Sequence, residues 1–176
     1  MDFNYEVKVP KDRVAVLLGV KGSIKRKIQT ALNIKLIIDS KTGDVVLEGK
    51  DSLNLLVGQN IVKAIGRGFN PEVALELLNE NNHFEIINVE DFANNSKNRF
   101  VGLKSRVIGT GGKARKTVEI LTDTKIVVYG KTIGIIGNYE GVELARKAFE
   151  SLLGGSRHST IYAWLDRQKK KLKIKL

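Results

Sequence analysis

The pattern Gly-x-x-Gly occurs twice in the same setting in this chain of 176 residues, first at residues 19–22 and again at residues 109–112. Each copy follows an aliphatic pair and precedes a basic, helix-compatible stretch, after which a β-branched run begins. Glycine permits sharp turns and close main-chain contacts that other residues do not. One copy means little, but two copies in the same setting predict that the chain repeats one structural module.

The residues around both copies predict the same order of elements, β-α-α-β-β-α, from the alternating or helical spacing of their apolar positions. In the first half, the expected elements are a strand at 6–9, helices at 11–18 and 24–32, strands at 36–38 and 45–47, a helix at 52–66 and an extra helix at 72–78. In the second half, they are a strand at 84–89, a helix that ends at 108, a helix at 113–122, strands at 125–128 and 131–137, and a helix at 140–153. A final helix is expected to be capped by Ser159 or Thr160, with its lysine-rich end loose and solvated.

The two halves align without a gap from Gly19 to Thr42 when the second half is shifted by 90 positions. We therefore expect an α+β fold with two tandem type I KH domains, each a three-stranded antiparallel sheet covered by helices on one face. The first domain, with a connector helix, is expected at 1–80, the second at 81–155, and a C-terminal helix with a basic tail at 156–176. The identical pairs in the alignment are Gly19/Gly109, Gly22/Gly112, Lys35/Lys125, Lys41/Lys131 and Thr42/Thr132.

The formal charge of the chain is +11, which favours a polyanionic partner. The positive charge is concentrated around the glycine pattern, because no acidic residue occurs between Asp12 and Asp39 or between Asp91 and Glu119. A merely solvated basic surface is the alternative interpretation of the charge. KH domains clamp the backbone of single-stranded nucleic acid with a Gly-x-x-Gly loop, so the placement favours nucleic-acid binding.

Composition disfavours several other classes of function. Cysteine is absent and the only histidines are His83 and His158, so zinc sites and histidine-based triads are not expected. No apolar run approaches the roughly 18 residues of a membrane span, and the N-terminus does not resemble a signal peptide. Gly130-Lys131-Thr132 resembles the end of a P-loop, but Lys125 stands where its first glycine would be. We expect no catalytic residue, metal or cofactor, no membrane partner, and a cytoplasmic location.

The glycine loops are expected to hold a sugar-phosphate backbone, because glycine permits close approach and the following helix presents unpaired N–H groups. Bases would then lie beside aliphatic side chains such as Ile108 and Val127, within reach of Lys125. The second loop is the stronger candidate, whereas Val20 in the first loop is bulky and apolar and suits a protein contact as well. The candidate RNA-binding residues are Gly19, Val20, Lys21, Gly22, Lys25, Arg26, Ile108, Gly109, Thr110, Gly111, Gly112, Lys113, Arg115, Lys116, Lys125 and Val127.

Two other interpretations stay open at this point. The chain could be a general binder of single-stranded RNA or DNA, such as a regulator, because the sequence reveals no base preference. It could also be a protein-interaction scaffold in which the loops are only structural, which predicts weak, salt-sensitive RNA binding that loop substitutions leave unchanged. An enzyme is disfavoured because no catalytic constellation is present.

Three segments resemble the archaeal Pno/Dim-type KH proteins of small-ribosomal-subunit biogenesis: residues 106–113, the strand at 126–128 and the ending at 154–165. The resemblance covers nearly the whole chain. It implies binding of pre-ribosomal RNA near the three-prime end of the small-subunit rRNA, with the second loop as the main RNA site. It also implies a partnership with the Nob-type PIN-domain endonuclease, to which the cleavage would belong. The first loop, with Val20 and Lys21 at its centre, departs more from the family pattern.

Overall fold

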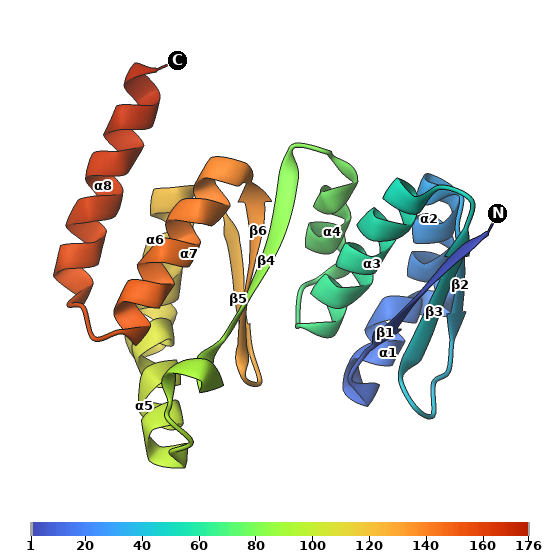
Figure 1. Ribbon diagram of the computed structural model, residues 1–176, viewed down its shortest axis with the longest axis horizontal. Coiled ribbons are helices and arrows are strands. Elements are labelled where there is room, and N and C mark those ends of the chain that lie inside the picture. The colour runs from blue at the N-terminus through green and yellow to red at the C-terminus, as the bar shows by residue number, and fades with distance from the viewer. Residues whose placement is uncertain (1, 176) are drawn as a thin grey trace. The chain divides into compact units, whose positions relative to one another are not determined.

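A computed structural model describes residues 2–175 of the chain (Figure 1). The chain divides into two compact units, Met1–Asn82 and His83–Leu176. Each unit contains one Gly-x-x-Gly loop and one three-stranded sheet. The repeat of the glycine pattern therefore corresponds to a repeat of the whole unit.

The first unit follows the expected order of elements. Asp51 caps its longest helix, because the Asp51 carboxylate accepts hydrogen bonds from the main-chain N–H groups of Leu53 and Asn54. The connector expected as one helix at 72–78 is instead a single α-helical turn followed by a 3-10 turn. The elements are β1 (Phe3–Lys8), α1 (Lys11–Leu18), η1 (Val20–Gly22), α2 (Ser23–Leu32), β2 (Lys35–Ile38), β3 (Asp44–Gly49), α3 (Ser52–Gly66), α4 (Pro71–Ala74) and η2 (Leu75–Leu78).

The second unit repeats this order and adds a long C-terminal helix. Its first strand ends one residue earlier than expected, because Val89 begins a 3-10 turn and donates its N–H to the Lys131 carbonyl at 2.8 Å. The elements are β4 (Asn82–Asn88), η3 (Val89–Phe92), α5 (Lys97–Ile108), η4 (Thr110–Gly112), α6 (Lys113–Thr122), β5 (Lys125–Tyr129), β6 (Thr132–Asn138), α7 (Tyr139–Leu153) and α8 (His158–Ile174).

The two sheets have the same topology. Their strand orders are β1-β3-β2 and β4-β6-β5, so the last strand of each unit lies in the middle and β2 and β5 are edge strands. In the first sheet both pairings are antiparallel, and in the second β5 pairs antiparallel with β6. The expected α+β class and the three-stranded antiparallel sheets are confirmed.

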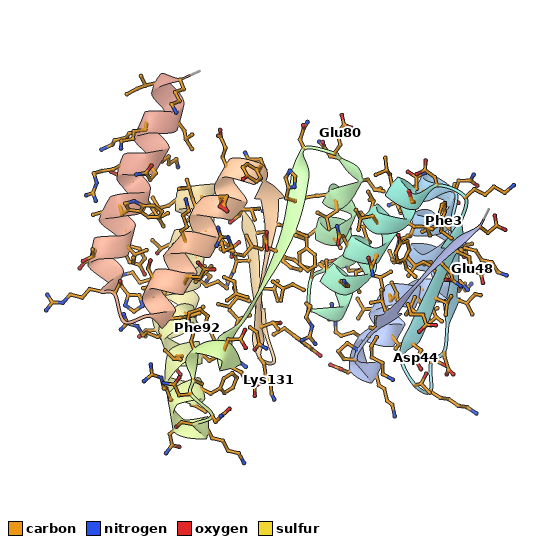
Figure 2. All side chains as sticks on the ribbon, viewed as in Figure 1. Phe3, Asp44, Glu48, Glu80, Phe92 and Lys131 are labelled. Atoms are coloured by element: carbon orange, nitrogen blue, oxygen red, sulfur yellow. The ribbon has the colours of Figure 1, made fainter. Side chains whose placement is uncertain are left out.

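Alternation along the strands places the helices on one face of each sheet. In β2, Leu36 is buried beneath the helices while Lys35 and Ile37 are exposed on the other face. That other face carries cross-strand ion pairs, in which Lys8 lies 3.1 Å from Asp44 and Lys35 lies 4.0 Å from Glu48. Figure 2 shows Asp44 and Glu48 at different points along β3. Exposed pairs of this kind contribute little to stability, so the buried helix-facing residues stabilise the sheet.

An arginine in the first helix of each unit connects that helix to the C-terminal end of the long helix that follows the sheet, α3 or α7. Arg13 on α1 donates to the carbonyls of Ile65 and Phe69, both at 2.8 Å. Arg106 on α5 donates to the Leu152 carbonyl at 3.0 Å and to the Ser156 carbonyl. Carbonyls at a helix C-terminus lack partners within the helix and favour a nearby cation. Each arginine therefore holds two helices together and satisfies carbonyls at the end of one of them.

Helix α8 belongs to the second unit and lies alongside α6 and α7 (Figure 1). It begins at His158 with Arg157 as an N-cap that makes no side-chain bond, so the expected cap by Ser159 or Thr160 is wrong. The expectation of a loose lysine-rich end is also wrong over residues 169–174, which continue the helix. An ion pair between Asp166 and Lys170 at 3.0 Å supports this part of the helix.

Buried side chains of α8 complete the second core. Ile161 and Leu165 are buried in it, and Tyr162 and Trp164 pack against it with partial exposure. The other core positions come from β4, η3, α5, α6, β5, β6 and α7, and they are Ile87, Val89, Val107, Val118, Ile126, Ile133, Ile135, Val142, Ala145, Ala148, Phe149, Leu152 and Leu153.

If α8 is a structural part of the second unit, shortening its core side chain will destabilise the protein. Leu165 is fully buried, so we expect Leu165→Ala to lower the free energy of unfolding by about 2–5 kcal/mol in urea denaturation. Ile174 on the same helix is 85% exposed, and Ile174→Ala should change it by less than about 0.5 kcal/mol. Equally small effects of both substitutions would show that α8 does not belong to the core.

Candidate nucleic-acid interface

The two glycine loops have nearly the same backbone conformation. Their first glycines have φ/ψ of 71°/177° at Gly19 and 75°/173° at Gly109. Their last glycines, Gly22 and Gly112, are left-handed, with φ of 73° and 78°. Each loop makes one 3-10 turn between two helices that meet at its ends. The alignment at an offset of 90 residues therefore holds in three dimensions.

The first glycine of each loop lies against the start of the next helix. A Cβ atom placed at Gly109 would lie 2.6 Å from the main-chain nitrogen of Ala114, and one at Gly19 would lie 2.8 Å from that of Ile24. Both distances are below any ordinary contact, and both glycines have positive φ. Only glycine fits at these positions, so the loop must remain close to the helix that follows it.

The third position distinguishes the loops. Lys21 stands there in the first loop with φ of 53°, a left-handed conformation that strains a residue with a Cβ atom. The Arg26 guanidinium covers this part of the loop by donating to the Lys21 carbonyl at 2.6 Å. Gly111 adopts φ of 60° in the second loop without that strain, and the space around it is open. The second loop thus presents a bare, accessible main chain.

The helices that follow the loops begin without side-chain caps. Gly22 and Gly112 are the N-cap residues of α2 and α6, and neither can supply a capping side chain. By contrast, α5 and α7 are capped by Ser96 and Asn138. The first turns of α2 and α6 contain no acidic residue. The Ser23 and Lys113 N–H groups donate to the loop carbonyls of Val20 and Thr110, and no side-chain cap or carboxylate occupies either helix start, so the helix dipoles favour an anion beside each loop.

Lysines surround the second loop, whereas its arginine is held by the protein. Lys113 and Lys116 are exposed on the first turn of α6, and within residues 2–175 their ammonium groups have no hydrogen-bond or ion-pair partner. Arg115 forms an ion pair with Glu119 and also donates to the Ile126 carbonyl at 3.2 Å. Arg115 therefore connects α6 to β5 instead of projecting toward solvent.

The edge strands meet these helices through main-chain groups. In the first unit, the Leu36 N–H donates to Gln29 Oε1 on α2 at 2.8 Å. In the second unit, the Ile126 carbonyl accepts from Arg115. Leu36 and Ile126 are equivalent in the repeat, and so are Gln29 and Glu119. Sequence analysis missed Gln29 and Glu119, although both stand four residues after predicted basic positions, Lys25 and Arg115, and so share their helix face.

Structure places two of the predicted residues away from the loop. Ile126 is buried beneath the helices, so its neighbours Lys125 and Val127 point to the opposite face of the sheet. The structure does not bring these two side chains together with the second loop. It does bring together the loop, Ile108 at the end of α5, and the first turn of α6.

Helix α8 adds side chains beside the second loop that the sequence did not single out. The His158 Nε2 lies 2.8 Å from the Arg106 carbonyl and must donate to it, because a carbonyl only accepts. Burial raises the pKa of the Tyr162 hydroxyl, and a hydrogen bond with Thr117 opposes that shift. Tyr162 therefore remains a neutral donor at physiological pH.

Comparison with known proteins identifies the family. The family model for the second KH domain of PNO1, described as a eukaryotic type KH-domain (KH-domain type I), matches residues 83–170. KH domain-containing protein MJ0443 of Methanocaldococcus jannaschii is 45% identical over 171 residues, which cover 95% of this chain and 74% of that protein. The chain belongs to the PNO1/Dim2-type family of KH-domain proteins.

Two further relatives extend the PNO1/Dim2-type assignment. RNA-binding protein pno1 of Drosophila pseudoobscura pseudoobscura is 32% identical over 165 residues, which cover 89% of this chain and 68% of that protein. In the crystal structure of the a/eIF2alpha–aDim2p–rRNA complex from Pyrococcus horikoshii OT3, a chain with 41% identity aligns with a TM-score of 0.88. That alignment covers 97% of this chain and 96% of the other. The family resemblance seen in the sequence is confirmed.

None of the helices within residues 2–175 combines the length and apolar character that a bilayer crossing requires. Over the same residues, no three His, Cys, Asp or Glu side chains are grouped so that they could bind a metal ion.

Alanine substitutions separate packing from backbone strain in the second loop. We expect Gly111→Ala to cost about 1 kcal/mol of unfolding free energy, because the added Cβ meets only backbone strain. Gly109→Ala should cost about 3 kcal/mol, because its Cβ also collides with Ala114. Gly102→Ala within α5 is the control and should stabilise by about 0.5–1 kcal/mol. The same cost for all three in chemical denaturation would show that the loop conformation is not kept in solution.

Proposed function

We propose that this PNO1/Dim2-type protein is a non-catalytic factor of ribosome assembly that binds single-stranded RNA in the three-prime region of small-subunit pre-rRNA. The second glycine loop is its main contact with the RNA backbone. The observation that carries this proposal is the unstrained, open main chain at Gly111, followed directly by an uncapped helix with exposed Lys113 and Lys116. Such a surface binds phosphate through main-chain N–H groups and charge.

The relatives support the identity of the RNA. A member of the family from Pyrococcus horikoshii has been crystallised in a complex with rRNA and a/eIF2alpha. Other relatives are named RNA-binding protein pno1. These names favour ribosomal RNA over an arbitrary single strand as the ligand of this chain. The family resemblance also supports a Nob-type PIN-domain endonuclease as a partner, which would carry out the cleavage.

The first loop has a lesser part in this proposal. Its strained Lys21 and the guanidinium of Arg26 on the loop carbonyl leave less main chain accessible to phosphate. Gln29 already occupies the N–H group of Leu36 on the neighbouring edge strand. Val20 at the tip of this loop is 81% exposed, which favours a contact with a protein partner over a contact with RNA.

Pairs of aspartate substitutions in each loop test whether the second loop is the main contact with RNA. We expect Thr110→Asp with Gly111→Asp to weaken binding of a short RNA from the three-prime end of small-subunit rRNA by about 100-fold or more, because carboxylates repel phosphate. Aspartate tolerates the left-handed conformation of Gly111, so the fold should survive. The corresponding variant Val20→Asp with Lys21→Asp lowers the net charge by three, compared with two for the second-loop variant, and should still weaken binding much less. Fluorescence anisotropy at near-physiological salt measures both.

A scrambled RNA of the same length controls for sequence. Preference for the rRNA sequence that disappears in the second-loop variant would support recognition at that loop. Retained affinity of that variant would refute the second loop as the main site. Equal binding of both RNAs, unaffected by either variant, would favour the scaffold interpretation.

Salt dependence provides an independent measure of phosphate contacts. The logarithm of the association constant should fall linearly with the logarithm of salt concentration, with a slope of about −0.7 for each phosphate contacted on a single strand. We expect a shallower slope for the second-loop variant than for the wild-type protein, because it loses contacts. An unchanged slope would mean that the phosphates are neutralised elsewhere on the basic surface.

A further inference from the structure

A pocket lies on the side of the second loop that faces helix α8. Its volume is about 340 Å³, within the range of about 300–1,000 Å³ typical of small-ligand sites. The polar residues that line it are Ser105, Arg106, Thr110, Lys113, His158 and Tyr162. They come from α5, the loop, α6 and α8, all within the second unit. Of the described residues that line this pocket, none is acidic.

The lining groups have the chemistry of a phosphate site. Arg106 uses Nε and Nη2 on carbonyls and has no hydrogen bond to Nη1 within the described residues, so one guanidinium nitrogen can still donate. The ammonium group of Lys113 adds a second positive charge. Hydroxyl groups of Ser105 and Thr110 can donate to phosphate oxygens. Cations and hydroxyl donors without a carboxylate favour an anion that accepts several hydrogen bonds.

Helix α6 separates this pocket from the edge strand. Arg115 on one side of α6 contacts Ile126 of β5, whereas Thr117 on another side meets Tyr162 of α8. The two helices run in the same direction, because Lys169 further along α8 donates to the carbonyl of Ile120 at 3.4 Å. The pocket is therefore a second surface on the loop, distinct from the one that faces β5.

The first unit provides an internal comparison. The residues equivalent to Ser105, Arg106, Thr110, Lys113 and Ala114 are Ala15, Val16, Val20, Ser23 and Ile24. Its loop side is thus mostly apolar where that of the second unit is cationic. The C-terminal helix that supplies His158 and Tyr162 has no counterpart beside the first loop, because the first unit has only the short α4 and η2 after α3. The first unit therefore lacks the residues that make the pocket of the second unit polar.

We propose that this pocket binds a backbone phosphate of the RNA strand that crosses the second loop, so that α8 takes part in RNA binding. This inference rests on the proposed function. The pocket shares Gly109, Thr110 and Lys113 with the loop, so a phosphate held there is a near neighbour of the one held at the start of α6. The RNA strand is bound on both sides of the loop, and α8 fixes the path of the RNA beyond the loop.

Ser105→Glu tests the pocket with a matched control. It places a carboxylate among the lining groups, and we expect about tenfold weaker binding of the three-prime rRNA oligonucleotide. Ala15→Glu is the control, because Ser105 and Ala15 are both exposed and equivalent in the repeat. Their carbonyls accept the same loop N–H group, from Gly109 at 2.8 Å and from Gly19 at 3.0 Å. The control changes the net charge equally and should change affinity less than about twofold. If Ser105→Glu fails to fold, Ser105→Ala removes only a lining hydroxyl and should weaken binding about threefold.

Uncharged linkages in place of single phosphates of the RNA identify which phosphate the pocket binds. When the phosphates of the RNA are replaced one at a time by methylphosphonate, replacement of one linkage should weaken binding to the wild-type protein but not to Ser105→Glu. Replacement of the linkage that binds at the start of α6 should weaken binding to both the wild-type protein and Ser105→Glu. Binding of the RNA by Ser105→Glu with wild-type affinity and the same linkage profile would overturn the pocket while leaving the second loop as the main site. Absence of RNA binding by the wild-type protein would instead overturn the proposed function itself.

Inorganic phosphate distinguishes a strand phosphate from a free one. Amide signals of Ser105 and His158 in NMR spectra should shift when the RNA binds and should not shift with millimolar inorganic phosphate alone. Shifts with inorganic phosphate, together with no effect of Ser105→Glu on RNA affinity, would assign the pocket to a free phosphate and overturn the proposal.

Discussion

Close contact between the first glycine of each loop and the following helix holds both units in the same shape. At Gly109 and Gly19 the main chain leaves no space for a Cβ atom, so the loop cannot move away from the helix without losing its turn. The contact fixes where the uncapped N–H groups of α2 and α6 point. It also fixes the helices on either side, whose other faces build the core and meet the edge strand. Loop geometry, core and candidate site are therefore consequences of one steric constraint.

The two units differ in what surrounds this common loop. In the first unit, Arg26 and Gln29 satisfy groups that a nucleic acid would otherwise meet. In the second unit, glycine replaces the strained lysine, and α8 encloses the free side of the loop with polar side chains. The same fold therefore carries loop surfaces of different chemistry in its two copies. The difference lies in side chains and in one added helix, since the backbone conformation of the loops is nearly the same.

Local patterns made the fold predictable from the sequence, because glycine positions and helical spacing report on nearby residues. The helices and strands on both sides of each loop were predicted within a few residues. The orientation of β5 was not, since Ile126, Val127 and Val128 are all apolar and the run does not tell which of them faces the core. The contacts of Arg115 with Ile126 and of His158 on α8 with Arg106 on α5 join different elements of the fold. No short-range signal specifies them, so the full surroundings of the loop became visible only in the folded chain.

The missing cap on α6 has a consequence for the dynamics of the second unit. Gly112 supplies no side-chain acceptor to the first turn of α6, where the Lys113 N–H donates to the Thr110 carbonyl of the loop. A phosphate at this position would act as the cap, supplying the acceptor that Gly112 cannot. The N-terminal turn of α6 would then fray in the unbound protein and become ordered on binding, with slower amide hydrogen exchange. Ligand binding and the completion of a helix would be the same event.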